Sequence, residues 1–151
     1  MNGKKWRSRI KYTYATLLEE YGVPSIPILW SNRAEHFIKR YDSTHVLSTG
    51  SFMEDHCTFL FPYDLSSISR LFDTQERALG MFKPYTLTSP EHLMRHEFYH
   101  YLHFLTNGPT PDTERNEYLH RQRMPRREGV VNKYHQEEID AEDFANAYEN
   151  N

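Results

Sequence analysis

The chain has 151 residues, enough for one domain with a single core, and 15% of them are aromatic. Its net charge of −3 gives no electrostatic basis for binding nucleic acid, and basic residues cluster only at 4–11 and 121–127. The single cysteine, Cys57, excludes an internal disulfide and a multi-thiolate zinc finger, and the absence of an apolar signal peptide or membrane span makes a reducing cytoplasm the expected location.

The first part of the chain predicts one amphipathic helix. After a frayed basic lead at residues 1–7, apolar residues recur at helical spacing from Ile10 to Tyr21. Gly22 and Pro24 then end the helix. Its apolar stripe predicts a helix that packs on the core and takes no part in chemistry.

The middle of the chain predicts a small antiparallel or mixed sheet. A short apolar strand comes first, and two strands joined as a hairpin supply buried aromatic bulk. The expected strands cover residues 26–30, 45–53 and 57–63. Residues 34–41 fit a helical turn or a strand, residues 64–72 a short helix, and residues 74–83 a weakly helical or looped connection. Together with the helices on either side, this order predicts an α+β domain.

Residues 89–107 predict a helix with clear ends, because Ser89 is a typical N-cap, Pro90 suits the first helical position and Gly108 follows the last turn. The H-E-x-x-H motif at residues 96–100 falls in the middle of this helix. Its two histidines lie one turn apart on one face, a spacing that lets both imidazoles bind one zinc ion. Glu97 lies beside that face and can act as the general base that takes a proton from the attacking water.

The last part of the chain predicts two more helices with a surface loop between them. The helices cover residues 113–123 and 134–148, and the loop covers residues 124–129. A catalytic zinc ion takes three protein ligands, so the third must come from outside the motif helix. The acidic final helix is the best source. Glu138 ranks first because it borders a face of small alanines, Asp140 ranks second and Glu137 third.

Other side chains are candidates for supporting roles. His103 lies one turn beyond His100 on the same helical face, where it can orient a ligand or touch the substrate. Hydrolysis of a peptide also needs a group that stabilises the oxyanion. The candidates for this role are Tyr118, His120, Tyr134 and His135, and the sequence does not choose among them.

The motif helix and the final helix resemble those of the ImmA/IrrE-type zinc metallopeptidases. Residues 96–103 are similar to the H-E-x-G-H-x-x-H stretch of that family, with Tyr99 in place of the glycine, and residues 138–145 to its E-x-x-A-x-x-F-A element. The resemblance implies a gluzincin-like peptidase with a single zincin-like domain over residues 1–151, in which the final helix carries the third ligand. The implied zinc ligands are His96, His100 and Glu138, and the implied general base is Glu97.

Three functions fit these features. The first is a zinc-dependent endopeptidase whose protein or peptide substrate lies extended along an edge strand, 45–53 or 57–63. The second is a non-catalytic, zinc-stabilised protein-binding or regulatory module, in which a fourth ligand such as His120 or His135 closes the site. The third is a nucleic-acid-associated protein that uses residues 121–127, which the acidic net charge disfavours. We favour the peptidase.

Overall fold

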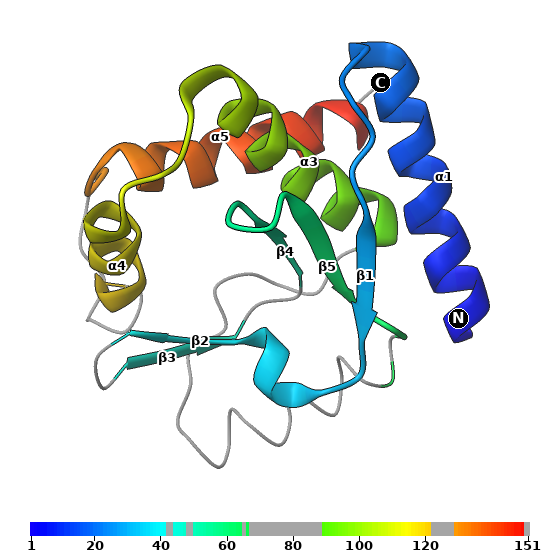
Figure 1. Cartoon of the computed structure of the whole chain (residues 1–151), viewed down its shortest axis with the longest axis horizontal. Coiled ribbons are helices and arrows are strands. Elements are labelled where there is room, and N and C mark those ends of the chain that lie inside the picture. Colours follow the sequence, from blue (N-terminus) through cyan, green and yellow to red (C-terminus); the bar gives the residue numbers. More distant parts are fainter. Residues whose placement is uncertain (42–43, 48–49, 65, 67–88, 122–128, 150–151) are drawn as a thin grey trace.

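Helices and a small mixed sheet form an α+β fold, which confirms the predicted class (Figure 1). The computed structural model describes residues 1–41, 44–47, 50–64, 66, 89–121 and 129–149. The helices are α1 (Gly3–Tyr21), α3 (Pro90–Asn107), α4 (Asp112–Arg121) and α5 (Lys133–Glu149). Most of the predicted helix at 64–72 and of the loop at 124–129, and all of the connection at 74–83, lie outside the described residues.

The central strand of the sheet is β5 (Thr58–Pro62), which is buried along most of its length. β4 (Ser51–Met53) pairs antiparallel with it, as the predicted hairpin requires. The other neighbour, β1 (Ile28–Ser31), runs parallel to β5, so of the two expected alternatives, antiparallel and mixed, the sheet is mixed. A strand that is apolar on both faces is most stable between two others, and its position excludes residues 57–63 as an edge strand.

The predicted strand at residues 45–53 is divided between two sheets. Its first half belongs to β3 (Thr44–Leu47), which pairs antiparallel with β2 (Ile38–Tyr41), and only its end forms β4. Residues 34–41 combine both predicted alternatives, because the short 3-10 helix η1 (Ala34–Phe37) leads directly into β2. In Figure 1 the β2–β3 pair lies apart from the three-stranded sheet and below α4.

α1 begins at Gly3, so the frayed lead predicted for the first residues is wrong. The Asn2 side chain caps the helix by accepting a hydrogen bond from the Lys5 backbone N–H at 2.8 Å. Trp6 is fully buried, and its indole N–H donates to the carbonyl oxygen of Pro62 at 2.8 Å. This buried aromatic anchor ties the first turn of the helix to the end of β5, a contact that local sequence signals do not reveal.

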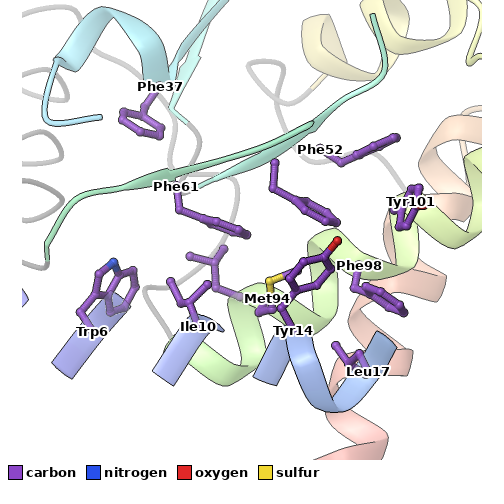
Figure 2. Packing of buried hydrophobic residues seen from close by; sticks show 12 residues of the cluster. Trp6, Ile10, Tyr14, Leu17, Phe37, Phe52, Phe61, Met94, Phe98 and Tyr101 are labelled. Atoms are coloured by element: carbon purple, nitrogen blue, oxygen red, sulfur yellow. The ribbon is translucent and has the colours of Figure 1, made fainter. Parts of the chain in front are cut away.

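The core lies between the three-stranded sheet and the helices α1 and α3 (Figure 2). Its buried apolar side chains include Ile10, Tyr14 and Leu17 from α1, Met94, Phe98 and Tyr101 from α3, and Phe52, Phe59 and Phe61 from the sheet. Aromatic rings meet edge to face, as in the Tyr14–Phe59 pair with ring centroids 5.4 Å apart. This packing fixes one side of α3 and leaves another side to face α5.

α5 packs along α3, as Figure 1 shows. Ala141 and Ala145 are fully buried at this interface, in agreement with the expectation that small side chains let the two helices approach closely. The predicted ends of α3 are confirmed, because Ser89 accepts a hydrogen bond from the His92 backbone N–H and Gly108 caps the last turn. None of the helices in the described part of the chain combines the length and apolar character needed to cross a membrane.

Candidate metal centre

His96, His100 and Glu138 bring their donor atoms together between α3 and α5. The Nε2 atoms of the two histidines lie 3.3 Å apart. The Glu138 carboxylate lies 2.7 Å from His100 Nε2 through Oε1 and 3.3 Å from His96 Nε2 through Oε2. A tetrahedral zinc ion with ligands at about 2.0–2.1 Å separates its donor atoms by about 3.3 Å. The two histidines match this spacing and the Glu138 oxygens lie close to it, so the three residues could hold such an ion.

Burial and charge act against each other at this site. Burial disfavours the charged imidazole of His100, but the carboxylates of Glu138 and Glu137 outweigh it and raise the pKa of His100 to about 9. In the same way, burial lowers the pKa of His96, but Glu138 and Glu142 together hold that pKa well above its ordinary value. Burial raises the pKa of Glu138, but the two imidazoles hold it well below its usual range. The metal-free group therefore holds protons on its imidazoles, and a bound cation would replace those protons.

A second carboxylate of α5 stands behind each imidazole. His96 donates a hydrogen bond from Nδ1 to Glu142 Oε1 at 2.6 Å, and His100 donates from Nδ1 to Glu137. An ionised carboxylate can only accept, so the Nδ1 atoms carry the protons. This arrangement orients both rings and leaves the Nε2 atoms to face Glu138, as in metal sites where a carboxylate supports each histidine ligand.

Glu97 is buried at 4% exposure beside the two histidines. Its Oε2 accepts a hydrogen bond from the backbone N–H of Phe52 at 3.0 Å, which ties the carboxylate to β4. The negative charge of Glu97 also contributes to the raised pKa values of His96 and His100, after burial and the closer carboxylates. The structure therefore brings the predicted general base close to the predicted ligands.

The other predicted site residues lie around this group in different ways. Asp140 is outside it, because two positions along a helix correspond to about 200° and turn this side chain away from the face of Glu138. Its Oδ1 accepts a hydrogen bond from Gln136 Nε2 at 2.9 Å on the exposed side of α5. His103 Nδ1 lies 3.0 Å from Glu137 Oε1, so it reaches the site through the carboxylate behind His100. Among the described residues, the carboxylate of the group is that of Glu138, not Asp140.

Of the four oxyanion candidates, Tyr134 has the most direct contact with the site. Its ring stacks near His100 with centroids 6.3 Å apart, and burial together with the charge of Glu138 raises its pKa well above the ordinary value. Tyr118 packs against Tyr134, with ring centroids 5.3 Å apart. His135 instead accepts a hydrogen bond from the Val131 N–H at the start of α5, and His120 is exposed on α4.

Sequence reasoning missed His92, which lies one turn before His96 and is buried at 5% exposure. Its Nε2 is hydrogen-bonded to Glu142 Oε2 at 2.9 Å and its Nδ1 to Glu149 Oε1 at 2.8 Å. The signal was present, because residues 92, 96 and 100 repeat at intervals of four and so line one helical face.

Comparison of the chain with protein families, curated proteins and solved structures found no match. The fold and the site therefore define only a class: an α+β protein with a buried His-His-Glu group between two helices. Because a fold does not determine a function, the function has to be argued from the chemistry of that group.

Proposed function

We propose that this protein is a zinc-dependent peptidase whose zinc ligands are His96, His100 and Glu138. The observation that carries the proposal is the convergence of two Nε2 atoms and one carboxylate within 4.8 Å of one another. Two histidines and a glutamate are a donor set that catalytic zinc sites use. Zinc held by them supplies Lewis-acid catalysis, since it acidifies water and polarises a carbonyl group.

Glu97 is the general base in this proposal. Its carboxylate is buried, anchored to the Phe52 N–H and close to both ligand imidazoles. It takes a proton from the attacking water and transfers that proton to the amine that leaves. A base on α3 that is also hydrogen-bonded to β4 is positioned for this transfer before the substrate arrives.

The number of protein donors favours catalysis over a purely structural site. Among the described residues the group contains three donors, and neither His120 nor His135 belongs to it. Structural zinc sites are closed by four protein ligands, whereas catalytic sites keep one position for water or substrate. This observation supports the peptidase over the zinc-stabilised regulatory module.

We assign the substrate, a protein or peptide in extended conformation, to β4. In the described sheet β4 pairs only with β5, so it is an edge strand, and it lies against α3. Addition of an extended segment to an edge strand supplies main-chain hydrogen bonds without requiring a particular sequence. Residues 51–53 are the part of the predicted edge strand 45–53 that lies beside Glu97.

Tyr134 is the residue we propose for stabilising the oxyanion. Its raised pKa keeps the hydroxyl protonated at neutral pH, so it can donate to the carbonyl oxygen on which negative charge develops. Tyr134→Phe removes only this oxygen, and we expect it to lower kcat about 10²-fold while zinc content stays unchanged. An unchanged kcat would remove Tyr134 from the chemistry.

We also propose that the protein is an ImmA/IrrE-type peptidase and that it works in the cytoplasm. The H-E-x-x-H helix, the ligand from the final helix and the alanines between these helices agree with the features of ImmA/IrrE-type peptidases and their zincin-like fold. Tyr99, which stands in place of the family glycine, packs against Phe144 of α5 with ring centroids 5.6 Å apart. We place the protein in a reducing cytoplasm because it has a single cysteine.

The experiment that tests the proposal compares zinc content and proteolysis in wild type and Glu97→Gln. Glutamine keeps an oxygen that can accept from the Phe52 N–H, but it cannot take a proton. We expect full zinc content and a loss of about 10²- to 10⁴-fold in cleavage of a denatured protein. Glu117→Gln is the matched control, because that side chain is exposed on α4. The peptidase would be rejected if wild type lacked stoichiometric zinc. Equal cleavage by wild type and Glu97→Gln would also reject it.

A further inference from the structure

We infer that His92 is a positioning residue for the metal ligand His96 and that it acts through Glu142. The inference rests on the proposed function, since it concerns how firmly one of the proposed zinc ligands is held. His92 is not one of the three residues of the donor group. Its two hydrogen-bond partners are both carboxylates of α5, Glu142 and Glu149.

The Glu142 carboxylate bridges two imidazoles of α3. Its Oε1 accepts from His96 Nδ1 at 2.6 Å, and its Oε2 is bonded to His92 Nε2 at 2.9 Å. Because both oxygens are hydrogen-bonded, the carboxylate cannot rotate freely. Its fixed orientation in turn fixes the orientation of the His96 ring. Orientation of a ligand ring by its outer partner commonly changes metal affinity by about 10- to 100-fold.

The corresponding carboxylate behind His100 needs less support. Glu137 is bonded to His100 and His103 in the same bridging manner, but its side chain is only 4% exposed. The Glu142 side chain is 40% exposed, so water competes for its oxygens and other rotamers are open to it. His92, with a side chain only 6% exposed, is the buried group that removes this freedom. We therefore expect the His96 side of the site to depend on its outer imidazole more than the His100 side does.

Glu149 completes the arrangement from the last turn of α5. It bonds His92 Nδ1 at 2.8 Å, so both nitrogens of the ring are engaged and the ring cannot rotate without losing a bond. Hydrogen bonds thus link Glu149, His92, Glu142 and His96 in series between the two helices. The role of His92 through Glu142 can be separated from its role in holding Glu149, because each uses a different nitrogen.

Two substitutions of His92 each retain only one of its two hydrogen bonds. Glutamine places its amide nitrogen three bonds from Cβ, like Nε2 of histidine, and so retains a donor for Glu142. Asparagine places its amide nitrogen two bonds from Cβ, like Nδ1, and retains a donor only for Glu149. The experiment measures the zinc dissociation constant of wild type, His92→Gln and His92→Asn by competition with a chromophoric chelator. The visible absorption spectrum of the cobalt-substituted proteins is recorded in parallel, because it reports ligand geometry.

We expect His92→Asn to weaken zinc binding about 10-fold or more and to shift the cobalt spectrum, and His92→Gln to restore most of both. Glu142→Gln, at a position whose side chain is 40% exposed, should give a similar loss. Adding His92→Asn to Glu142→Gln should then weaken binding no further, because both changes break the same link. Rescue by asparagine rather than glutamine, or additive losses in the double variant, would overturn the inference.

The same titration separates this inference from the proposed function. A wild-type protein that binds no zinc would reject the metal site and the role of His92 with it. Wild type that binds zinc tightly, together with variants of equal affinity and unchanged cobalt spectra, would leave the peptidase in place and reject only the role of His92.

Discussion

Helix α3 has two sides that hold their neighbours by different forces. One side is apolar and packs on α1 and the sheet through Met94, Phe98 and Tyr101. The other carries His92, His96, His100 and His103, which meet Glu137, Glu138, Glu142 and Glu149 of α5. Positions 94 and 96 are two residues apart, or about 200° around the helix, so the two sides face in nearly opposite directions.

The difference shows how one helix can present one side for stability and another for the proposed metal site. Apolar burial has no direction, and any well-fitting side chain provides it. Buried imidazoles and carboxylates stabilise the protein only when each finds a partner with correct geometry, and they are costly otherwise. We therefore expect changes on the apolar side to alter the free energy of unfolding, and changes on the imidazole side to alter metal affinity.

Breaking the apolar side should give the largest effect. Phe98 is fully buried, with ring contacts to Tyr14, Tyr21 and Tyr101. Phe98→Ala should lower the free energy of unfolding by about 3–5 kcal/mol, measured by urea denaturation in the presence of a chelator. Leu105→Ala, on the same helix but 45% exposed, should change it by less than about 0.5 kcal/mol. Similar losses in the two variants would contradict the division between the two sides of α3.

Breaking the imidazole side should reduce zinc binding. Glu138→Ala removes the only carboxylate of the donor group in the described structure, and we expect zinc affinity to fall by more than about 100-fold, beyond the range typical of outer partners. Asp140→Ala provides the matched control, since this carboxylate is on the same helix but outside the group. Equilibrium competition with a chelator measures both constants. A larger loss of zinc affinity in Asp140→Ala than in Glu138→Ala would identify Asp140 as the third ligand.

The sequence predicts the two sides of α3 unequally well. The ends of the helix depend on neighbouring residues, so Ser89 and Gly108 were sufficient to place them. The pairing of His96 and His100 follows from helical spacing, whereas the proposed role of Glu138 requires a choice among several acids of α5. What decides that choice is the rotation of α5 against α3, which depends on packing between segments distant in the chain.

Long-range packing also explains the features that the sequence left undecided or missed. The parallel pairing of β1 with β5 and the burial of Trp6 against the end of β5 both join segments that are far apart in the sequence. No local pattern specifies either contact. His92 was overlooked for a related reason, because a histidine four residues before a metal motif gains significance only when α5 supplies carboxylates to both of its nitrogens.

The pH dependence of zinc binding sharpens the comparison further. In the metal-free protein the pKa of His100 is raised to about 9 and that of His96 is held well above its ordinary value, so near neutral pH zinc must displace protons from both. Affinity should therefore rise with pH from 6.5 towards 9, by at most about tenfold per pH unit for each proton displaced. The pKa of Glu138 is lowered, so this carboxylate is already ionised and releases no proton to zinc in this pH range.

Titration calorimetry in two buffers with different ionisation enthalpies measures the protons released. We expect one to two protons per zinc ion near neutral pH and fewer above pH 9. Release close to zero at pH 8, where imidazoles with ordinary pKa values are already neutral, would show that the carboxylates of α5 do not hold protons on His96 and His100. Phe98→Ala should leave the proton count of the folded protein unchanged, because its contacts are on the other side of α3.

The smallest effect is expected from an ordinary contact between the same two helices. The Arg95 guanidinium lies over the ring of Tyr148, 4.8 Å from its centroid, and no metal ligand takes part. Tyr148 is also held by Glu20 and Tyr21 of α1, so α5 keeps its position when this contact is removed. Arg95→Ala should lower the free energy of unfolding by about 0.5–1 kcal/mol and leave the zinc dissociation constant unchanged. If zinc affinity falls as well, general packing of α5 on α3 governs the site, and the hydrogen bonds behind the ligands do not account for its affinity.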